Sequence, residues 1–248
     1  MSGAPDLPVL VACSHGTRSR AGHETVERLR AAVRERRSGV EVLAAHVDVQ
    51  EPELDAVVGD LAAAGRASVV VPLLLSTGYH VRVDIARAVA ASGGTAVAAE
   101  ALGPGAEVTG VLVERLREAL GPDGLDDPSL ALVLAAAGSS DERARADVER
   151  AVSLLATATG RPVRSGFLSA QEPAVADAVA TARAGGAGRV AVASYLLAPG
   201  VFSARLAAAG ADAVAEPMGP HPELVELVLR RYDAALSPAA RPAPLAPR

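Results

Sequence analysis

The 248-residue chain has no lysine or tryptophan, one cysteine and only 2 % aromatic residues. A single cysteine excludes an internal disulfide, and no apolar run reaches the ~18 residues that span a membrane. So few aromatic side chains argue against a surface that stacks nucleic-acid bases. The net charge of −5 argues against general binding to nucleic acid or anionic membranes. We therefore expect a cytoplasmic protein that binds neither nucleic acid nor membrane.

Several enzyme motifs are also missing. There is no G-x-x-x-x-G-K-[ST] phosphate loop, which the lack of lysine alone excludes. No G-x-G-x-x-G follows an apolar segment, and there is no G-x-S-x-G around a nucleophilic serine. These absences argue against ATP binding, dinucleotide binding and acyl-enzyme chemistry.

What the sequence does contain is an alternation of short apolar segments with amphipathic segments of helical period. Strands are expected at residues 9–12, 40–49, 68–75, 95–102, 130–136, 163–168, 189–197 and 212–215. Helices are expected at residues 23–36, 53–64, 81–92, 107–120, 141–159, 174–184, 201–209 and 223–236. Strands that alternate with helices predict parallel sheets. We expect an α/β fold of two tandem lobes, each a mostly parallel four-stranded sheet flanked by helices, with a cleft between them.

The two halves repeat each other. The tripeptide at residues 50–52 (Gln-Glu-Pro) recurs at 171–173, and the segment 100–104 has its counterpart at 216–220. The landmarks occur in the same order at a nearly constant offset, which indicates an internal duplication. We expect an N-terminal lobe at residues 1–121, a C-terminal lobe at 129–236 and a flexible tail at 237–248.

Three candidate metal ligands follow three consecutive strands of the first half: His15, Asp48 and His80. Their counterparts in the repeat are residues that neither bind metal strongly nor exchange protons near neutral pH: Ala137, Ser169 and Phe202. A role in folding would require the same residue types in both halves. Two histidines and a carboxylate are a common ligand set for first-row divalent metals. The sequence therefore predicts one active site, on the first half.

Two residues near these candidates have less specific interpretations. His46 precedes Asp48 by two residues, so the two side chains are expected on one face of their strand. His46 fits an outer-shell partner of the site and a half-buried structural histidine equally well. Cys13 ends a buried strand and is interpreted as a small core residue, not a third ligand.

Polar and small residues around the histidines suit an anionic ligand. Arg18 and Arg20 follow His15, and Arg82 follows His80. Guanidinium groups pair with carboxylates through two parallel hydrogen bonds. Thr17 and Gly78 stand in the same loops, where small residues let backbone N–H groups approach a ligand.

Residues 14–18 (Ser-His-Gly-Thr-Arg), 47–52 (Val-Asp-Val-Gln-Glu-Pro) and 72–80 (Pro-Leu-Leu-Leu-Ser-Thr-Gly-Tyr-His) resemble motifs of the sirohydrochlorin chelatases of the CbiX/SirB type. These enzymes are class II tetrapyrrole chelatases, and the resemblance covers residues 7–236. It implies two chelatase-like lobes and the insertion of a divalent metal into sirohydrochlorin without ATP. It also implies that His15, His80 and an acidic residue bind the metal, and that the two histidines are catalytic.

The resemblance also implies which residues bind the substrate and whether a cofactor is needed. The family's acidic ligand is often Glu, so whether the shorter Asp48 touches the metal directly stays open. The carboxylates of sirohydrochlorin would bind Arg18, Arg20 and Arg82, beside Thr17 and Gly78. No permanently bound cofactor is expected, since Fe²⁺ or Co²⁺ is itself a substrate.

Other functions remain possible at the same site. In the family that the sequence resembles, cobalt-specific long forms often carry a histidine-rich tail. The tail at 237–248 contains no histidine, so the resemblance favours Fe²⁺ and sirohaem over Co²⁺ and cobalamin. A non-catalytic carrier of metal or tetrapyrrole would use the same residues. Phosphoryl transfer of the histidine-phosphatase type is disfavoured because Ser14 occupies the place of a phosphate-binding arginine. Two lobes in one chain suffice to build the cleft, so a monomer is expected.

Overall fold

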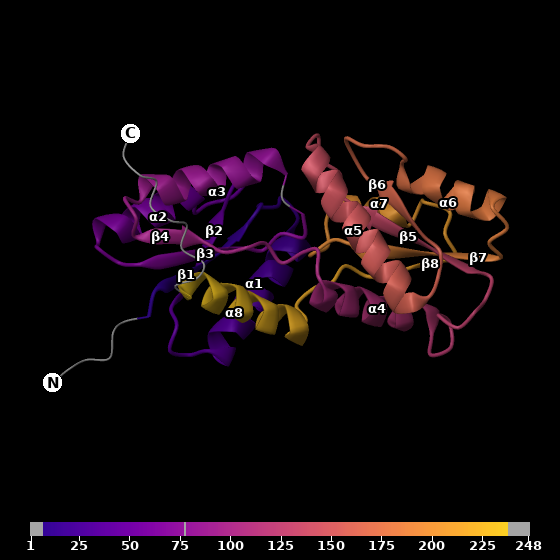
Figure 1. Ribbon diagram of the computed structural model, residues 1–248, viewed down its shortest axis with the longest axis horizontal. Helices are drawn as coiled ribbons and strands as arrows, with labels where there is room; N and C mark the ends of the chain where they lie inside the picture. The colour runs from indigo at the N-terminus through magenta and orange to yellow at the C-terminus, as the bar shows by residue number, and fades with distance from the viewer. Residues whose placement is uncertain (1–6, 77, 238–248) are drawn as a thin grey trace.

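The protein forms two α/β lobes that lie side by side in the computed structural model (Figure 1). Residues 7–76 and 78–237 are described, without the side chains of residues 79–81. The tail predicted at 237–248 lies outside these residues but for Ser237. In the part of the chain that is described, no helix is long and apolar enough to span a lipid bilayer.

Each lobe is built on a four-stranded parallel sheet. The first sheet has the order β2-β1-β3-β4 and the second has the order β6-β5-β7-β8, so the two halves repeat the same topology. Strands β1 and β5 are central and buried along their whole length, which explains their unbroken apolar sequences. The strands are β1 (Val9–Ser14), β2 (Val42–His46), β3 (Ser68–Pro72), β4 (Ala96–Ala98), β5 (Leu130–Ala136), β6 (Val163–Phe167), β7 (Arg189–Tyr195) and β8 (Ala213–Val214).

All the helices and strands expected from the sequence are present in the expected order, which confirms the α/β fold of two lobes. The structure differs from the expected ranges only in where some helices and strands begin and end. Helix α1 begins at Arg20 instead of His23, because the Ser19 hydroxyl accepts a hydrogen bond from the Gly22 N–H. The helices are α1 (Arg20–Arg36), α2 (Leu54–Ala63), α3 (Tyr79–Ala91), α4 (Ala106–Leu120), α5 (Glu142–Thr159), α6 (Val175–Ala184), α7 (Val201–Leu206) and α8 (Pro222–Leu236).

The two halves exchange their last helices. Helix α4 ends the first half of the sequence but packs on α5 and β7 of the second sheet. Helix α8 ends the second half and returns to pack on α1 and β3, where it lies beside α1 in Figure 1. The predicted division at 1–121 and 129–236 thus follows the sequence repeat, whereas each packed lobe contains one helix from the other half. We call the lobe with β1–β4, α1–α3 and α8 the first lobe, and the other the second lobe.

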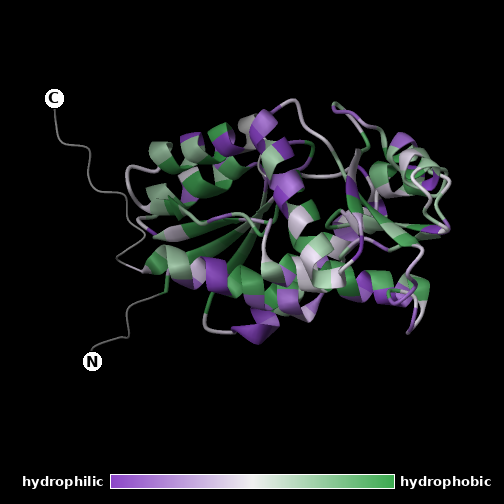
Figure 2. Ribbon diagram, turned by 45° about the vertical axis from the view of Figure 1, so that its right-hand side comes forward, coloured by the Kyte–Doolittle hydropathy of each residue, from purple (hydrophilic) through white to green (hydrophobic). Residues whose placement is uncertain are grey.

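The exchange produces one hydrophobic core that runs through both lobes. The faces of β1, β3, β5 and β7 that carry α1, α8, α4 and α5 belong to a single buried cluster. The opposite faces form separate clusters, with α2 and α3 on the first sheet and α6 and α7 on the second. Figure 2 shows mostly hydrophobic strands between helices that combine hydrophobic and hydrophilic residues. The lobes are therefore held together by buried apolar surface.

A buried hydrogen bond also joins the lobes where β3 and β7 end. The Tyr195 hydroxyl donates to the carbonyl oxygen of Leu75 at 2.7 Å. A Cβ at Gly103 would lie 2.5 Å from that hydroxyl and 2.6 Å from the Leu75 oxygen. Glycine is therefore required at position 103.

We expect Tyr195→Phe to lower the free energy of unfolding by about 1–3 kcal/mol, because the buried Leu75 carbonyl would lose its donor. Urea denaturation followed by circular dichroism should show a lower midpoint with an unchanged slope. A midpoint equal to that of the wild type would show that this bond contributes nothing to the association of the lobes.

Candidate functional site

The candidate site lies at the carboxyl edge of the first sheet. Strand β1 stands between β2 and β3, so the loops with His15 and Asp48 and the start of α3 with His80 follow three adjacent strands. The Asp48 N–H donates to the His15 carbonyl at 3.0 Å, and the Val47 N–H donates to the Ser14 carbonyl at 3.0 Å. These bonds continue the pairing of β1 and β2 beyond the strands. They hold His15 and Asp48 side by side, with both side chains exposed.

Gly16 makes this close approach of the two loops possible. Its φ is +97°, and a Cβ there would lie 2.0 Å from the Asp48 carbonyl oxygen. The second lobe repeats the arrangement, with φ of +89° at Gly138 and a Cβ position 1.8 Å from the Ser169 oxygen. The two loops, predicted to be equivalent from the sequence repeat, thus have the same backbone conformation at Gly16 and Gly138. The same backbone carries His15 in one lobe and alanine in the other.

Asp48 lies in a loop and not on a strand. Strand β2 ends at His46, and the chain then turns through a positive φ of 70° at Val49. The expectation that His46 and Asp48 share one face of a strand is therefore wrong. The Asp48 carboxylate accepts a hydrogen bond from the Val49 N–H at 2.7 Å and otherwise faces solvent. This turn sets the direction of the carboxylate.

His80 is placed by its backbone alone. It is the second residue of α3, after the N-cap Gly78, and its side chain lies outside the described residues. Among the side chains that the structure does describe, no three His, Cys, Asp or Glu gather closely enough to hold a metal ion. The ligand set of His15, Asp48 and His80 stays a prediction.

The three candidate arginines are exposed. Arg20 pairs with Glu24 one helical turn away, with 2.7 Å between Nε and Oε1. An exposed pair of this kind is weak and easily exchanged for another anion. Arg18 follows His15 in the loop, and Arg82 stands two residues after His80 on α3. The three guanidinium groups can therefore meet a ligand from solvent.

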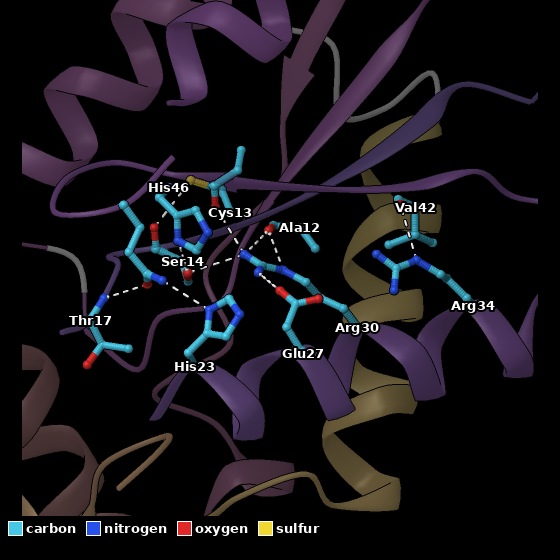
Figure 3. A network of polar contacts seen from close by, with 12 residues as sticks. Ala12, Cys13, Ser14, Thr17, His23, Glu27, Arg30, Arg34, Val42 and His46 are labelled. Carbon is cyan, nitrogen blue, oxygen red and sulfur yellow. Dashed lines mark hydrogen bonds and ion pairs between the residues drawn. The ribbon is translucent and has the colours of Figure 1, made fainter. Parts of the chain in front are cut away.

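The backbone N–H of Thr17, which was expected to approach a ligand, already has a partner within the protein. The Thr17 N–H already donates to the Gln50 side-chain oxygen at 2.7 Å, and the Gln50 amide nitrogen contacts His23 Nδ1 at 3.0 Å. This bridge ties the His15 loop to α1 and is visible in Figure 3. A Cβ at Gly78 would lie 3.0 Å from Ser139 Oγ of the second lobe. Gly78 thus marks a point where the lobes touch.

Sequence reasoning missed a buried arginine directly behind the site (Figure 3). Arg30 of α1 is 0 % exposed, and its guanidinium donates to the carbonyl of Ala12 at 2.9 Å and to that of Ala45 at 3.1 Å. It also donates to Ser14 Oγ at 3.2 Å and pairs with Glu27. Arg30 therefore connects the ends of β1 and β2. An arginine between two apolar positions of a predicted helix was the available signal.

His46 is a member of the same network. Its Nδ1 lies 2.9 Å from Ser14 Oγ, and the side chain is buried. Burial, and next the charge of Arg30, lower the pKa of His46, so the imidazole is neutral at pH 7. The Ser14 hydroxyl accepts from Arg30, and its oxygen lies within hydrogen-bond distance of Nδ1 of the ring. His46 thus contacts the residue before His15 rather than solvent.

Cys13 is buried among the apolar residues under α2 and α3, which confirms it as a core residue. Burial raises the pKa of its thiol to about 12. The thiolate that metals bind is therefore scarce at neutral pH.

A cavity of about 390 Å³ opens where the two lobes meet. Ser19, at the start of α1, lines it from the first lobe. Gly200, Ser203 and Glu216 line it from the carboxyl ends of β7 and β8. The cavity therefore lies beside the loop that carries His15.

The CbiX family matches residues 9–119 and again residues 131–235. The fold is similar to SirB from Bacillus subtilis with Fe³⁺, with a TM-score of 0.78 and 20 % identity over 94 % of this chain and 96 % of that one. It is also similar to CbiX, described as the terminal enzyme for the biosynthesis of sirohaem in denitrifying bacteria, with a TM-score of 0.63 and 21 % identity over 92 % and 100 % of the two chains. Comparison with curated protein sequences gives no match.

Proposed function

Because the chain belongs to the CbiX family, we propose that it is a sirohydrochlorin chelatase, which inserts a divalent metal ion into sirohydrochlorin without ATP. One observation carries the proposal. Two lobes share the same loop backbone, yet only the first places His15, Asp48 and His80 after adjacent strands. Similar proteins with known structures support it, since their descriptions name Fe³⁺ and cobalt as bound metals.

The chemistry needs a group that holds the metal, replaces its water and takes up the protons that leave the pyrrole nitrogens. Neutral imidazoles do both near pH 7. We assign these roles to His15 and His80, with Asp48 as the acidic ligand that balances the charge of the metal. The exposure of His15 and Asp48 leaves room for the flat ring to approach the metal.

The carboxylates of the tetrapyrrole are assigned to the exposed arginines. Arg18 follows His15 in its loop, Arg20 begins α1 and Arg82 lies on α3, all three exposed. Bidentate pairing with guanidinium would orient the ring over the metal. Thr17 and Gly78 complete the loops that face it.

We propose Fe²⁺ as the preferred metal, because residues 237–248 carry no histidine, whereas the cobalt-specific long forms that the sequence resembles often carry a histidine-rich tail. The cobalt-specific reaction of cobalamin synthesis is the second candidate. Parallel rate measurements with Fe²⁺ and Co²⁺ decide between them, and a faster rate with Co²⁺ would reverse the assignment.

The decisive experiment is anaerobic mixing of sirohydrochlorin with Fe²⁺ or Co²⁺, with and without the protein, while the absorbance of the ring is followed. Faster insertion than the spontaneous reaction supports a chelatase. Tight binding of metal and ring without acceleration would show a carrier. A protein that binds neither the metal nor the ring, and does not accelerate insertion, would overturn the proposed function altogether.

We also expect a monomer. Each lobe contains a helix from the other half, and both lobes border the cavity beside the site, so one chain completes the arrangement. Size-exclusion chromatography with light scattering should give the mass of one chain, 24.9 kDa, at micromolar concentration. A mass of twice that value would contradict this prediction.

A further inference from the structure

The buried polar network behind the candidate site has a direct internal comparison. In the first lobe, Ser14 of β1 pairs in register with His46 of β2, and both contact each other below α1. In the second lobe, Ala136 of β5 pairs in the same register with Phe167 of β6. Equivalent positions of the duplicated fold thus hold polar side chains in the first lobe and apolar side chains in the second.

Arg30, the third member of the network, also has an apolar counterpart in the second lobe. Arg30 stands at the same distance from the N-cap of α1, Ser19, as Val152 stands from the N-cap of α5, Asp141. Val152 packs against the continuous core. Arg30, Ser14 and His46 therefore correspond to Val152, Ala136 and Phe167, and the apolar set is sufficient for folding.

Burial of the guanidinium is unfavourable on its own. Desolvation is the largest effect on the pKa of Arg30 and lowers it, and the hydrogen bond and charge of Glu27 are the first of the effects that act against it. Well-packed apolar side chains often stabilise a fold as well as a buried ion pair does, or better. The polar set in the first lobe thus calls for a reason other than stability.

The contacts of these three side chains with the ends of β1 and β2 suggest that reason. Arg30 bonds the carbonyl oxygens of Ala12 and Ala45, and so links the last residues of β1 to those of β2. Ser14 is the residue before His15, and His46 ends the strand before the Asp48 loop. We propose that Arg30, Ser14 and His46 are positioning residues that fix the His15 loop relative to the Asp48 loop, and thereby set the spacing of the metal-binding groups.

This inference rests on the proposed function, and its test is metal binding without the tetrapyrrole. The triple variant Ser14→Ala/Arg30→Val/His46→Phe installs the second lobe's own residues in the first lobe. Glu27 stays, because the second lobe has the exposed Glu149 at the equivalent position. Co²⁺ serves as the probe, with its Kd from calorimetric titration and its geometry from visible absorption.

We expect the triple variant to melt at the wild-type temperature or above it, while its Kd for Co²⁺ rises ~10–100-fold and its visible spectrum changes. The insertion rate should fall with it. The matched control is Arg34→Val, because Arg34 is on the same helix and donates to the carbonyl of Val42 at the opposite end of β2 at 3.1 Å. Its Co²⁺ affinity and spectrum should equal those of the wild type.

If the triple variant does not fold, Ser14→Ala alone provides the test. It removes the hydroxyl shared by Arg30 and His46 and leaves the carbonyl contacts of Arg30, so the Kd should rise about tenfold. A folded variant with wild-type Co²⁺ affinity and spectrum would overturn the positioning role and leave the proposed function intact. A wild type that neither binds Co²⁺ nor accelerates insertion would instead overturn the proposed function, and this inference with it.

Discussion

Joint replacement of His15 and His80 by alanine is expected to reduce the rate of metal insertion to that of the spontaneous reaction, a loss of ~10²–10⁴-fold. The two imidazoles are assigned both metal binding and the uptake of pyrrole protons, so neither role survives in the double variant. Anaerobic absorbance assays with sirohydrochlorin and Fe²⁺ provide the measurement. Calorimetric titration with the metal alone should show that binding is lost as well.

The matched control for this variant is a histidine remote from the loops. His221 caps α8 through Nδ1, which accepts from the Glu223 N–H at 3.2 Å, and its Nε2 contacts Glu114 at 2.9 Å. His221→Ala should weaken the fold slightly and leave the insertion rate unchanged. Full activity of the double variant would contradict the assignment of the catalytic site to the first lobe.

Gly16→Ala is expected to lower the free energy of unfolding by more than about 2 kcal/mol, because it adds a side chain at a φ of +97°. The new Cβ would also lie 2.0 Å from the Asp48 carbonyl oxygen, so the two loops must move apart. Activity should fall with the separation of His15 from Asp48. Thermal unfolding and insertion rates of the variant measure the two effects.

Two other glycines, Gly138 in the second lobe and Gly65 after α2, serve as controls for Gly16. Gly138→Ala meets the same obstacle in the second lobe, at 1.8 Å from the Ser169 oxygen, and should destabilise equally while the folded fraction keeps its activity. Gly65 has a φ of +68° and no atom within 4 Å of the added Cβ, so Gly65→Ala should cost only ~1 kcal/mol. Equal loss of activity in the Gly16 and Gly138 variants would place the active site on both lobes.

The order and type of the helices and strands could be predicted because each local signal agrees with the fold. Strand β5 is an uninterrupted apolar run, and α5 begins at the capping residue Asp141, whose carboxylate accepts from the Arg143 N–H. The repeat fixed which loops correspond. Strand ends were less accurate: β4 stops at Ala98 because Leu102 and Gly103 turn to donate to Leu74.

The exchange of α4 and α8 could not be predicted. Both helices are amphipathic, with one buried apolar face, and such a face fits either sheet equally well. The choice depends on packing between distant segments, such as that of α8 on α1 and β3. Local periodicity contains no information on which sheet a helix covers.

The candidate site could be predicted in part. The positions of His15 and Asp48 followed from strand order, whereas the turn at Val49 was not visible in the sequence. The network around Arg30 was missed although the repeat contained the signal. Comparison of Ser14 with Ala136 and of His46 with Phe167 shows polar residues at core positions, a substitution that packing alone does not explain.

The return of α8 to the first sheet has a consequence for synthesis on the ribosome. The face of β1 and β3 that α8 covers is translated before β5–β8, whereas residues 222–236 emerge after them. Until then the nascent first lobe exposes an apolar surface, a state prone to aggregation and recognised by chaperones. The first sheet is therefore covered on both faces only after residues 222–236 have emerged.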